Sequence, residues 1–253
     1  MTGEPPYNPP GSGWGGTGYG GAAYGQAGWP APGPTAADRV RVAWQRRYES
    51  DYVFHFWSAL GWTVLTCGIY SYYVLYQLVR RSREHNMRRI ALLDGAAAFA
   101  WEQATRQGTA DELRPAFERI STNMATLRSQ TTDFRDPSAW VVLGIVSSGI
   151  ASVVAYCLLD GDLVTHDHAE GAVEAELSAI YARLGAATVA PDPTRLKGRH
   201  NYAGRVIATV ATLGIYGLFW LYDVMHQGNE HFRHNWVWED SLAESVQALA
   251  GGR

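Results

Sequence analysis

Hydrophobic residues gather in three blocks that are nearly free of charge, and polar residues fill the segments between them. The first block covers residues 52–79 and the second covers residues 137–159. The third covers residues 206–225, and its uncharged part has 17 residues, which is the lower limit for a helix that crosses a bilayer. Uncharged blocks of this length are unusual in soluble proteins, so the pattern predicts three membrane segments.

The polar segments 80–136, 160–205 and 226–253 predict amphipathic helices, because each contains apolar residues at steps of three and four. The apolar stripes are Leu113, Phe117, Ile120, Met124 and Leu127; Val173, Leu177, Ile180 and Leu184; and Leu242, Val246 and Leu249. Such stripes must be buried, and we expect them to pack on one another within the chain.

The N-terminal residues predict a tail followed by a short helix. Residues 1–35 are mostly Gly, Pro, Ala, Tyr and Trp, which cannot bury enough apolar surface to offset the entropy of ordering, so we expect disorder. Residues 36–51 carry four arginines and predict an interfacial helix at a membrane surface. Together these elements predict an all-α fold: a multi-pass helical membrane protein with amphipathic cytoplasmic helices and a disordered N-terminal tail.

Charge and cysteine content add little to this picture. The 253 residues include 21 Lys and Arg against 24 Asp and Glu, so the chain shows no sign of binding nucleic acid. Its two cysteines, Cys67 and Cys157, both lie in apolar blocks, where we interpret them as small hydrophobic side chains.

The first and third blocks are copies of one unit, because Thr66-Cys67-Gly68-Ile69-Tyr70 and Thr212-Leu213-Gly214-Ile215-Tyr216 align at an offset that also matches later residues. The second block contains a fainter copy, Gly149-Ile150, followed by His166 at the distance that separates Gly68 from His85. The residues of this structural repeat motif are Thr66, Gly68, Ile69, Tyr70, Tyr76, Glu84 and His85, and Thr212, Gly214, Ile215, Tyr216, Trp220, Tyr222, Glu230 and His231.

The motif also carries a family resemblance. The run from Ala211 to Tyr222 resembles an uncharacterised family of prokaryotic integral membrane proteins, a domain of unknown function marked by Thr-x-Gly-Ile-Tyr followed by Trp. The first block departs from that pattern at Val74, where Trp is expected. The resemblance implies a place in the cell membrane, and it implies no reaction, ligand or catalytic residue.

Each block could cross the membrane or turn back inside it. Length and apolarity favour three spanning helices. The alternative is a re-entrant hairpin that turns at Thr-x-Gly, where glycine tolerates a break and the hydroxyl can satisfy a freed backbone group. Hairpins would explain why arginines flank the first block on both sides, since both flanks would then face the cytoplasm.

Two polar clusters invite a functional interpretation. His226, Glu230, His231 and His234 follow the third block and could supply nitrogen and oxygen ligands to a metal ion, but their spacing matches no recognised metal motif. Acidic residues and histidines at 160–170 follow the second block, and we interpret them as a solvated helix start. The sequence therefore assigns no metal ion and no other cofactor.

The remaining features concern packing and catalysis. Gly144, Ser148 and Ser152 lie four apart in the second block, and small residues at that spacing let helices approach closely. No nucleophile, phosphate-binding or redox motif is present, so we predict no catalytic residue and no enzyme activity.

These observations favour a structural or interaction role as a scaffold in the cell membrane. The expected partners are the lipid bilayer and either other membrane proteins or further copies of this chain. The alternative is a subunit of a transporter or channel, for which Asp223 is the candidate pathway charge.

Overall fold

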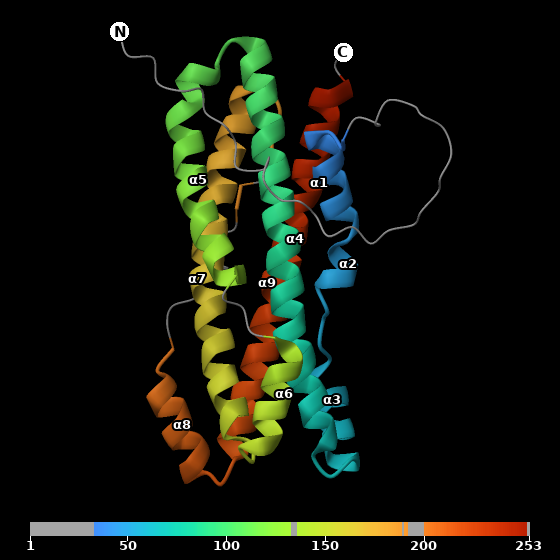
Figure 1. Cartoon of the computed structure of the whole chain (residues 1–253), viewed down its shortest axis with the longest axis vertical. Coiled ribbons are helices and arrows are strands. Elements are labelled where there is room, and N and C mark those ends of the chain that lie inside the picture. Colours follow the sequence, from blue (N-terminus) through green and yellow to red (C-terminus); the bar gives the residue numbers. More distant parts are fainter. Residues whose placement is uncertain (1–32, 133–135, 189, 192–199, 252–253) are drawn as a thin grey trace, which may run out of the picture.

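The computed structural model describes residues 33–132, 136–188, 190–191 and 200–251, and within these ranges the protein is all-α with nine helices (Figure 1). Most of the tail predicted at 1–35 lies outside the described residues. The helices are α1 (Ala36–Gln45), α2 (Arg47–Ser50), α3 (Phe56–Leu65), α4 (Ile69–Gln107), α5 (Ala110–Thr132), α6 (Pro137–Val146), α7 (Ile150–Arg183), α8 (Tyr202–Ala211) and α9 (Ile215–Gly251).

Three long helices, α4, α7 and α9, run parallel and form the body of the bundle (Figure 1). All three begin at the end drawn lowest in the figure, and each is preceded there by a short antiparallel helix, α3, α6 or α8. Helix α5 returns alongside α4 and α7. The three repeat units therefore share one orientation, which consecutive single spans could not achieve.

Each apolar block folds as a helical hairpin rather than as the continuous helix that length favoured. The reason is a left-handed pair of residues at each turn: Cys67 and Gly68, Ser148 and Gly149, and Leu213 and Gly214, with φ between 49° and 95°. An L-residue avoids this region, so the helix must stop there. Among the residues described, every helix is too short or too polar to qualify as a membrane span.

The hydroxyl of the repeat motif supports the turn as the sequence suggested. Thr66 Oγ1 donates to Trp62 O at 2.8 Å and accepts from Tyr70 N at 2.9 Å, so it joins the two helices across the break. Thr212 makes the equivalent bonds to Ala208 O and from Tyr216 N.

The amphipathic stripes pack on one another and form the core of the upper bundle, where Phe117, Leu127, Leu177 and Leu242 are fully buried. A second apolar cluster, around Leu75, Leu78 and Trp220, lies between the hairpins. Helix α1 packs on α4 and α9 towards the end opposite the hairpin turns (Figure 1), and its predicted place at a membrane surface stays a prediction. Its buried face, Ala36, Val40 and Ala43, explains this position.

Candidate functional site

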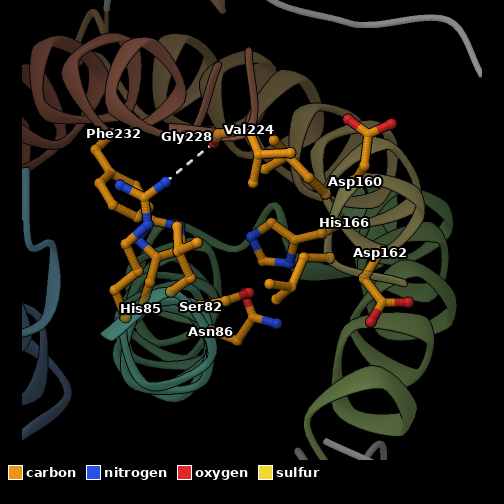
Figure 2. Close-up of a pocket in the computed structure, with 13 residues that line it drawn as sticks. Ser82, His85, Asn86, Asp160, Asp162, His166, Val224, Gly228 and Phe232 are labelled. Carbon is orange, nitrogen blue, oxygen red and sulfur yellow. Dashed lines mark hydrogen bonds between the residues drawn. The ribbon is translucent and has the colours of Figure 1, made fainter. Parts of the chain in front are cut away.

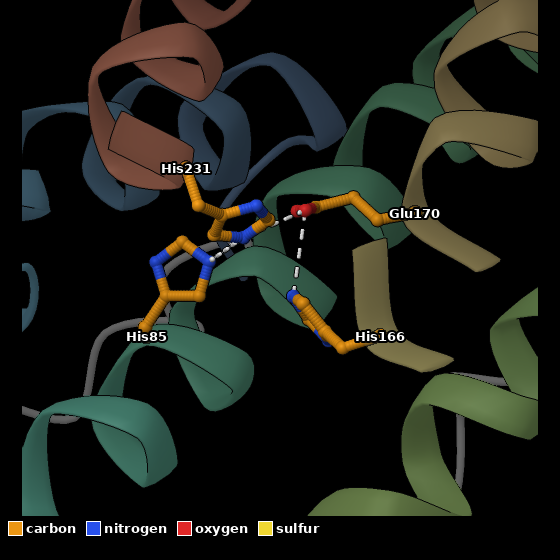
Figure 3. Close-up of side chains that lie close together, drawn as sticks. All are labelled: His85, His166, Glu170 and His231. Carbon is orange, nitrogen blue, oxygen red and sulfur yellow. Dashed lines mark hydrogen bonds and ion pairs between the residues drawn. The ribbon is translucent and has the colours of Figure 1, made fainter. Parts of the chain in front are cut away.

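Three histidines meet in the interior between the two apolar clusters. His85, His166 and His231 are each the seventeenth residue after a turn glycine, Gly68, Gly149 or Gly214. Because α4, α7 and α9 are parallel and start at the same end, equal spacing places the three rings at one level. Glu170 lies one helical turn beyond His166 and completes a buried cluster of four residues (Figure 3).

The ligating atoms of these four side chains all lie within 4.8 Å of one another. His231 Nε2 is 3.2 Å from His85 Nε2 and 3.2 Å from Glu170 Oε2. His166 Nε2 is 3.4 Å from the same carboxylate oxygen. All four side chains are at most 5% exposed, so the atoms face one another without bulk water between them.

Carboxylates orient two of the rings from behind. Asp51 Oδ1 lies 2.9 Å from His85 Nδ1, and Asp167 Oδ1 lies 2.8 Å from His231 Nδ1. A carboxylate only accepts hydrogen bonds, so each Nδ1 carries a proton and each Nε2 faces the cluster, where it has a free lone pair whenever its ring is neutral. Such a carboxylate behind a histidine is a usual companion of metal-ligating imidazole.

Arginines hold the carboxylates of the cluster in place. Arg89 is fully buried and binds Glu170, Glu174 and Glu239. Arg88 binds Glu239 and, at 2.8 Å, Asp51. Asn235, in α9, donates from Nδ2 to Glu170 Oε2 at 3.0 Å and lies 3.1 Å from His231 Nε2. One polar network thus joins α4, α7, α9 and Asp51, which lies just before α3.

His166 is the least constrained member of the cluster. Both of its ring nitrogens are buried, and neither makes a well-aligned hydrogen bond to the described residues, although Nε2 lies 3.4 Å from Glu170 Oε2. A cavity of about 40 Å³ adjoins His85 and His166, and Asp160, Asp162 and Phe232 also line it (Figure 2). This volume is enough for one or two water molecules beside the cluster.

Burial and charge shift the pKa values of these groups in opposite directions. Burial lowers the pKa of His85 to about 3 in spite of Asp51. Burial would also lower the pKa of His231, but hydrogen bonds with Asp167 and Glu170 raise it to about 9. Burial favours protonation of Glu170, yet Arg89 and the histidines hold its pKa well below the usual range. The cluster therefore attracts one positive charge to its centre.

The structure separates the residues of the repeat motif into two groups. His85 and His231 enter the cluster, whereas Glu84 and Glu230 point outward to Arg80 and Arg233. Trp220 is buried between the hairpins. The others lie at or near the hairpin turns, exposed or half-buried: Thr66, Gly68, Ile69, Tyr70, Tyr76, Thr212, Gly214, Ile215, Tyr216 and Tyr222.

The proposed packing residues of the second block lie within its hairpin. A Cβ on Gly144 would lie 2.9 Å from Ser152 Oγ and 3.4 Å from Leu75, so α6, α7 and α4 approach closely there. Ser148 is in the left-handed turn instead of on a helix face. His226 and His234, which were considered with His231 as ligands, lie outside the cluster.

Sequence reasoning did not connect Glu170, Asp51 or Asp167 with the histidines. The available signal was the equal spacing of His85, His166 and His231 from a glycine. At the twenty-first position after the same glycines stand Arg89, Glu170 and Asn235, and Glu170 contacts both of the others. Equivalent positions of the three repeat units therefore meet at the carboxylate of Glu170.

The end of the bundle that holds the three turns is apolar and exposed. Leu65 is 75% exposed, Val146 is 78% exposed and Leu213 is 95% exposed. Residues 56–79, 137–159 and 206–222 contain no Asp, Glu, Lys or Arg. We refer to these three hairpin segments together as the apolar end.

Comparisons with protein-family models, with curated proteins and with solved structures found no match. The resemblance of the third block to an uncharacterised membrane family therefore stays a prediction.

Proposed function

We propose that this chain is a membrane-anchored scaffold protein whose apolar end is inserted into one leaflet of a bilayer. The observation that carries the proposal is the common direction of the three hairpins, which puts all three exposed apolar turns at one end of the bundle (Figure 1). An exposed apolar surface on three neighbouring elements is unfavourable in water and typical of a surface with a partner.

The depth of the apolar end supports one leaflet as the partner. The first charged residues after the turn glycines are Arg80, Asp160 and Asp223, which follow by twelve, eleven and nine residues. At 1.5 Å per residue the uncharged helices rise by about 14–18 Å. This is roughly half of the 30 Å hydrocarbon thickness of a bilayer, so the hairpins have the length to enter and return.

The basic flanks agree with this arrangement. A hairpin returns to the side from which it entered, so the arginines before and after the first block face one membrane surface. Arg80 and Arg83 are exposed just beyond the apolar end, where their side chains can reach lipid phosphates. The polar upper bundle would then stand on that side and offer its surface to other proteins.

The transporter alternative has less support. Its candidate pathway charge, Asp223, forms an ion pair with Arg205 at 3.1 Å and remains partly exposed. A neutralised pair of this kind does not favour the passage of an ion or a proton.

The test uses Cys67, which lies in the first turn and is exposed. In the Cys157→Ser variant of the chain, Cys67 would be labelled with an environment-sensitive fluorophore. The labelled protein would then be reconstituted into liposomes whose lipids carry quenchers at known depths. We expect strongest quenching near the bilayer centre. A cysteine at Ala187, in a background without the two native cysteines, should report water. Strong quenching at Ala187 or a water-exposed Cys67 would reject one-leaflet insertion.

The same liposomes give the topology. Cysteines placed at Ala110 and Ala187 should react with an impermeant thiol reagent from the same side of the membrane. Reaction from opposite sides would mean that an apolar block crosses the bilayer, and the hairpin arrangement would then be excluded.

A further inference from the structure

We infer that His85, His166, His231 and Glu170 form a binding site for a single divalent transition-metal ion of the zinc type, which joins the three repeat units at their common centre. The inference does not depend on membrane insertion, because it rests on the buried cluster and not on the apolar end.

The spacing of the ligating atoms suits such an ion. In a tetrahedral site with metal–nitrogen bonds of about 2.0–2.1 Å, neighbouring ligand atoms are about 3.3 Å apart. The contacts of His231 with His85 and Glu170, and of His166 with Glu170, measure 3.2, 3.2 and 3.4 Å. Three edges of a tetrahedron are therefore already near the length that zinc requires.

The direction of the lone pairs gives a second, independent reason. Asp51 and Asp167 each hold a proton on Nδ1 of His85 and His231, so both Nε2 atoms point inward, and each is an acceptor when its ring is neutral. They meet the acceptor-only carboxylate of Glu170 and the imidazole of His166, which makes no well-aligned hydrogen bond within the described residues. Within the described residues, the neutral donor at the cluster is Asn235, whose Nδ2 reaches both Glu170 Oε2 and His231 Nε2. Converging acceptors repel one another unless a cation lies between them.

The charge of the surroundings also favours a divalent ion. Arg88, Arg89 and Arg81 are the buried cations of this region, and Arg81 bonds to backbone carbonyls and Asn229. The buried carboxylates of this region outnumber them: Asp51, Asp160, Asp167, Glu170, Glu174 and Glu239. When these acids are ionised, the region has an excess of negative charge, which a bound divalent ion would reduce. Uncompensated charge in a protein interior is costly, so the network has a physical reason to hold a cation.

The donor set indicates the class of ion. Three imidazole nitrogens and one carboxylate oxygen suit zinc and its neighbours in the first transition row, whereas calcium and magnesium prefer oxygen ligands. Each repeat unit supplies one imidazole, from α4, α7 or α9, so the ion would bind only when all three units are assembled.

The first experiment uses the wild-type full-length chain in detergent, stripped with a chelator and then titrated with Co²⁺. We expect one equivalent to bind with the intense visible absorption of tetrahedral cobalt, and Zn²⁺ to displace it while Mg²⁺ does not. Absence of binding, or the weak absorption of six-coordinate cobalt, would overturn the inference. The first of these results would mean that a proton on His231 alone stabilises the cluster.

The second experiment separates ligands from other histidines. His166→Ala should lower the affinity for Zn²⁺ by more than about 100-fold, beyond the effect of losing a supporting residue. The matched control is His168→Ala, two residues away on the exposed face of α7, which should bind as tightly as the wild type. Equal affinities of the two variants would exclude His166 as a ligand. Circular dichroism shows whether both variants are folded. If His166→Ala does not fold, the cobalt spectrum of the wild type decides whether the cluster binds a metal ion.

Discussion

His85 and His231 lie 146 residues apart in the chain and face each other with their Nε2 atoms 3.2 Å apart. Each ring is backed by a carboxylate of another segment, Asp51 before α3 or Asp167 in α7. The pair thus links four segments of the bundle, namely α4, α7, α9 and the chain just before α3, through two side chains that occupy equivalent positions in two repeat units.

Asp167→Asn should weaken metal binding without removing a ligand. The amide can no longer enforce the proton on Nδ1 of His231, so we expect a 10–100-fold loss of Zn²⁺ affinity, roughly the effect of removing such supporting partners elsewhere. Cobalt titration with a competing chelator measures it. The control is Asp160→Asn. Asp160 is on the same helix as Asp167 and also contacts a histidine, His200 at 2.7 Å, but that histidine is outside the cluster. Similar losses in both variants would argue against a positioning role for Asp167.

Arg89→Met should destabilise the folded protein by about 3–5 kcal/mol, because it leaves buried carboxylates without their cation. Arg89 is fully buried and contacts Glu170, Glu174 and Glu239. Chemical denaturation in one detergent gives the free energy of unfolding. Arg119→Met removes an exposed ion pair with Glu176 and should cost less than about 1 kcal/mol. If the two substitutions cost the same, the network of Arg89 is not structurally important.

Gly214→Ala should lower the free energy of unfolding by about 1–2 kcal/mol, because residue 214 has a φ of 95° that an L-residue adopts only with strain. Gly61→Ala is the matched control within the first hairpin. Gly61 is helical, and a Cβ there would have nothing within 4 Å, so alanine should stabilise the helix by up to about 1 kcal/mol. Opposite signs in denaturation experiments are the expected result, and a stabilising Gly214→Ala would contradict the left-handed turn.

Leu213→Asp should reduce binding to liposomes roughly 100-fold, since a carboxylate near the centre of the hydrocarbon costs about 3 kcal/mol. Leu213 lies in the third turn, and Asp tolerates its left-handed backbone better than most residues do. Val237→Asp changes an exposed residue of α9 far from the turns and should leave flotation with liposomes unchanged. Unaltered binding by Leu213→Asp would place the third turn outside the bilayer.

The helices and the turns were largely readable from the sequence. The stripe from Leu113 to Leu127 has helical spacing and is buried as expected. Apolar residues at steps of three and four share one face of a helix, so that face is buried as a unit. Thr-x-Gly marked the point where the apolar helix breaks. Whether it breaks into a hairpin was left open, because length alone favours a span and only φ values near 50° and 90° at residues 67 and 68 turn the chain back.

The site was harder to predict, as the Glu-His pairs of the repeat show. Neighbouring residues on a helix point about 100° apart, so either Glu84 or His85, and either Glu230 or His231, could face the interior. The spacing from glycine marked the histidines as equivalent, but it did not show which member of each pair is inside. Glu170 and Asp167 looked like a solvated helix start for the same reason.

The sequence by itself determined the local structure: the helical segments, their apolar faces, the repeated unit and the Thr-x-Gly step at which its helix can break. These properties depend on backbone sterics and on the spacing of side chains along one segment. Only the tertiary structure decided that three hairpins share one direction, and that His85, His166, Glu170 and His231 converge with their acceptors inward. That convergence depends on how α4, α7 and α9 are rotated about their axes, and the rotation is set by the simultaneous burial of faces on all three.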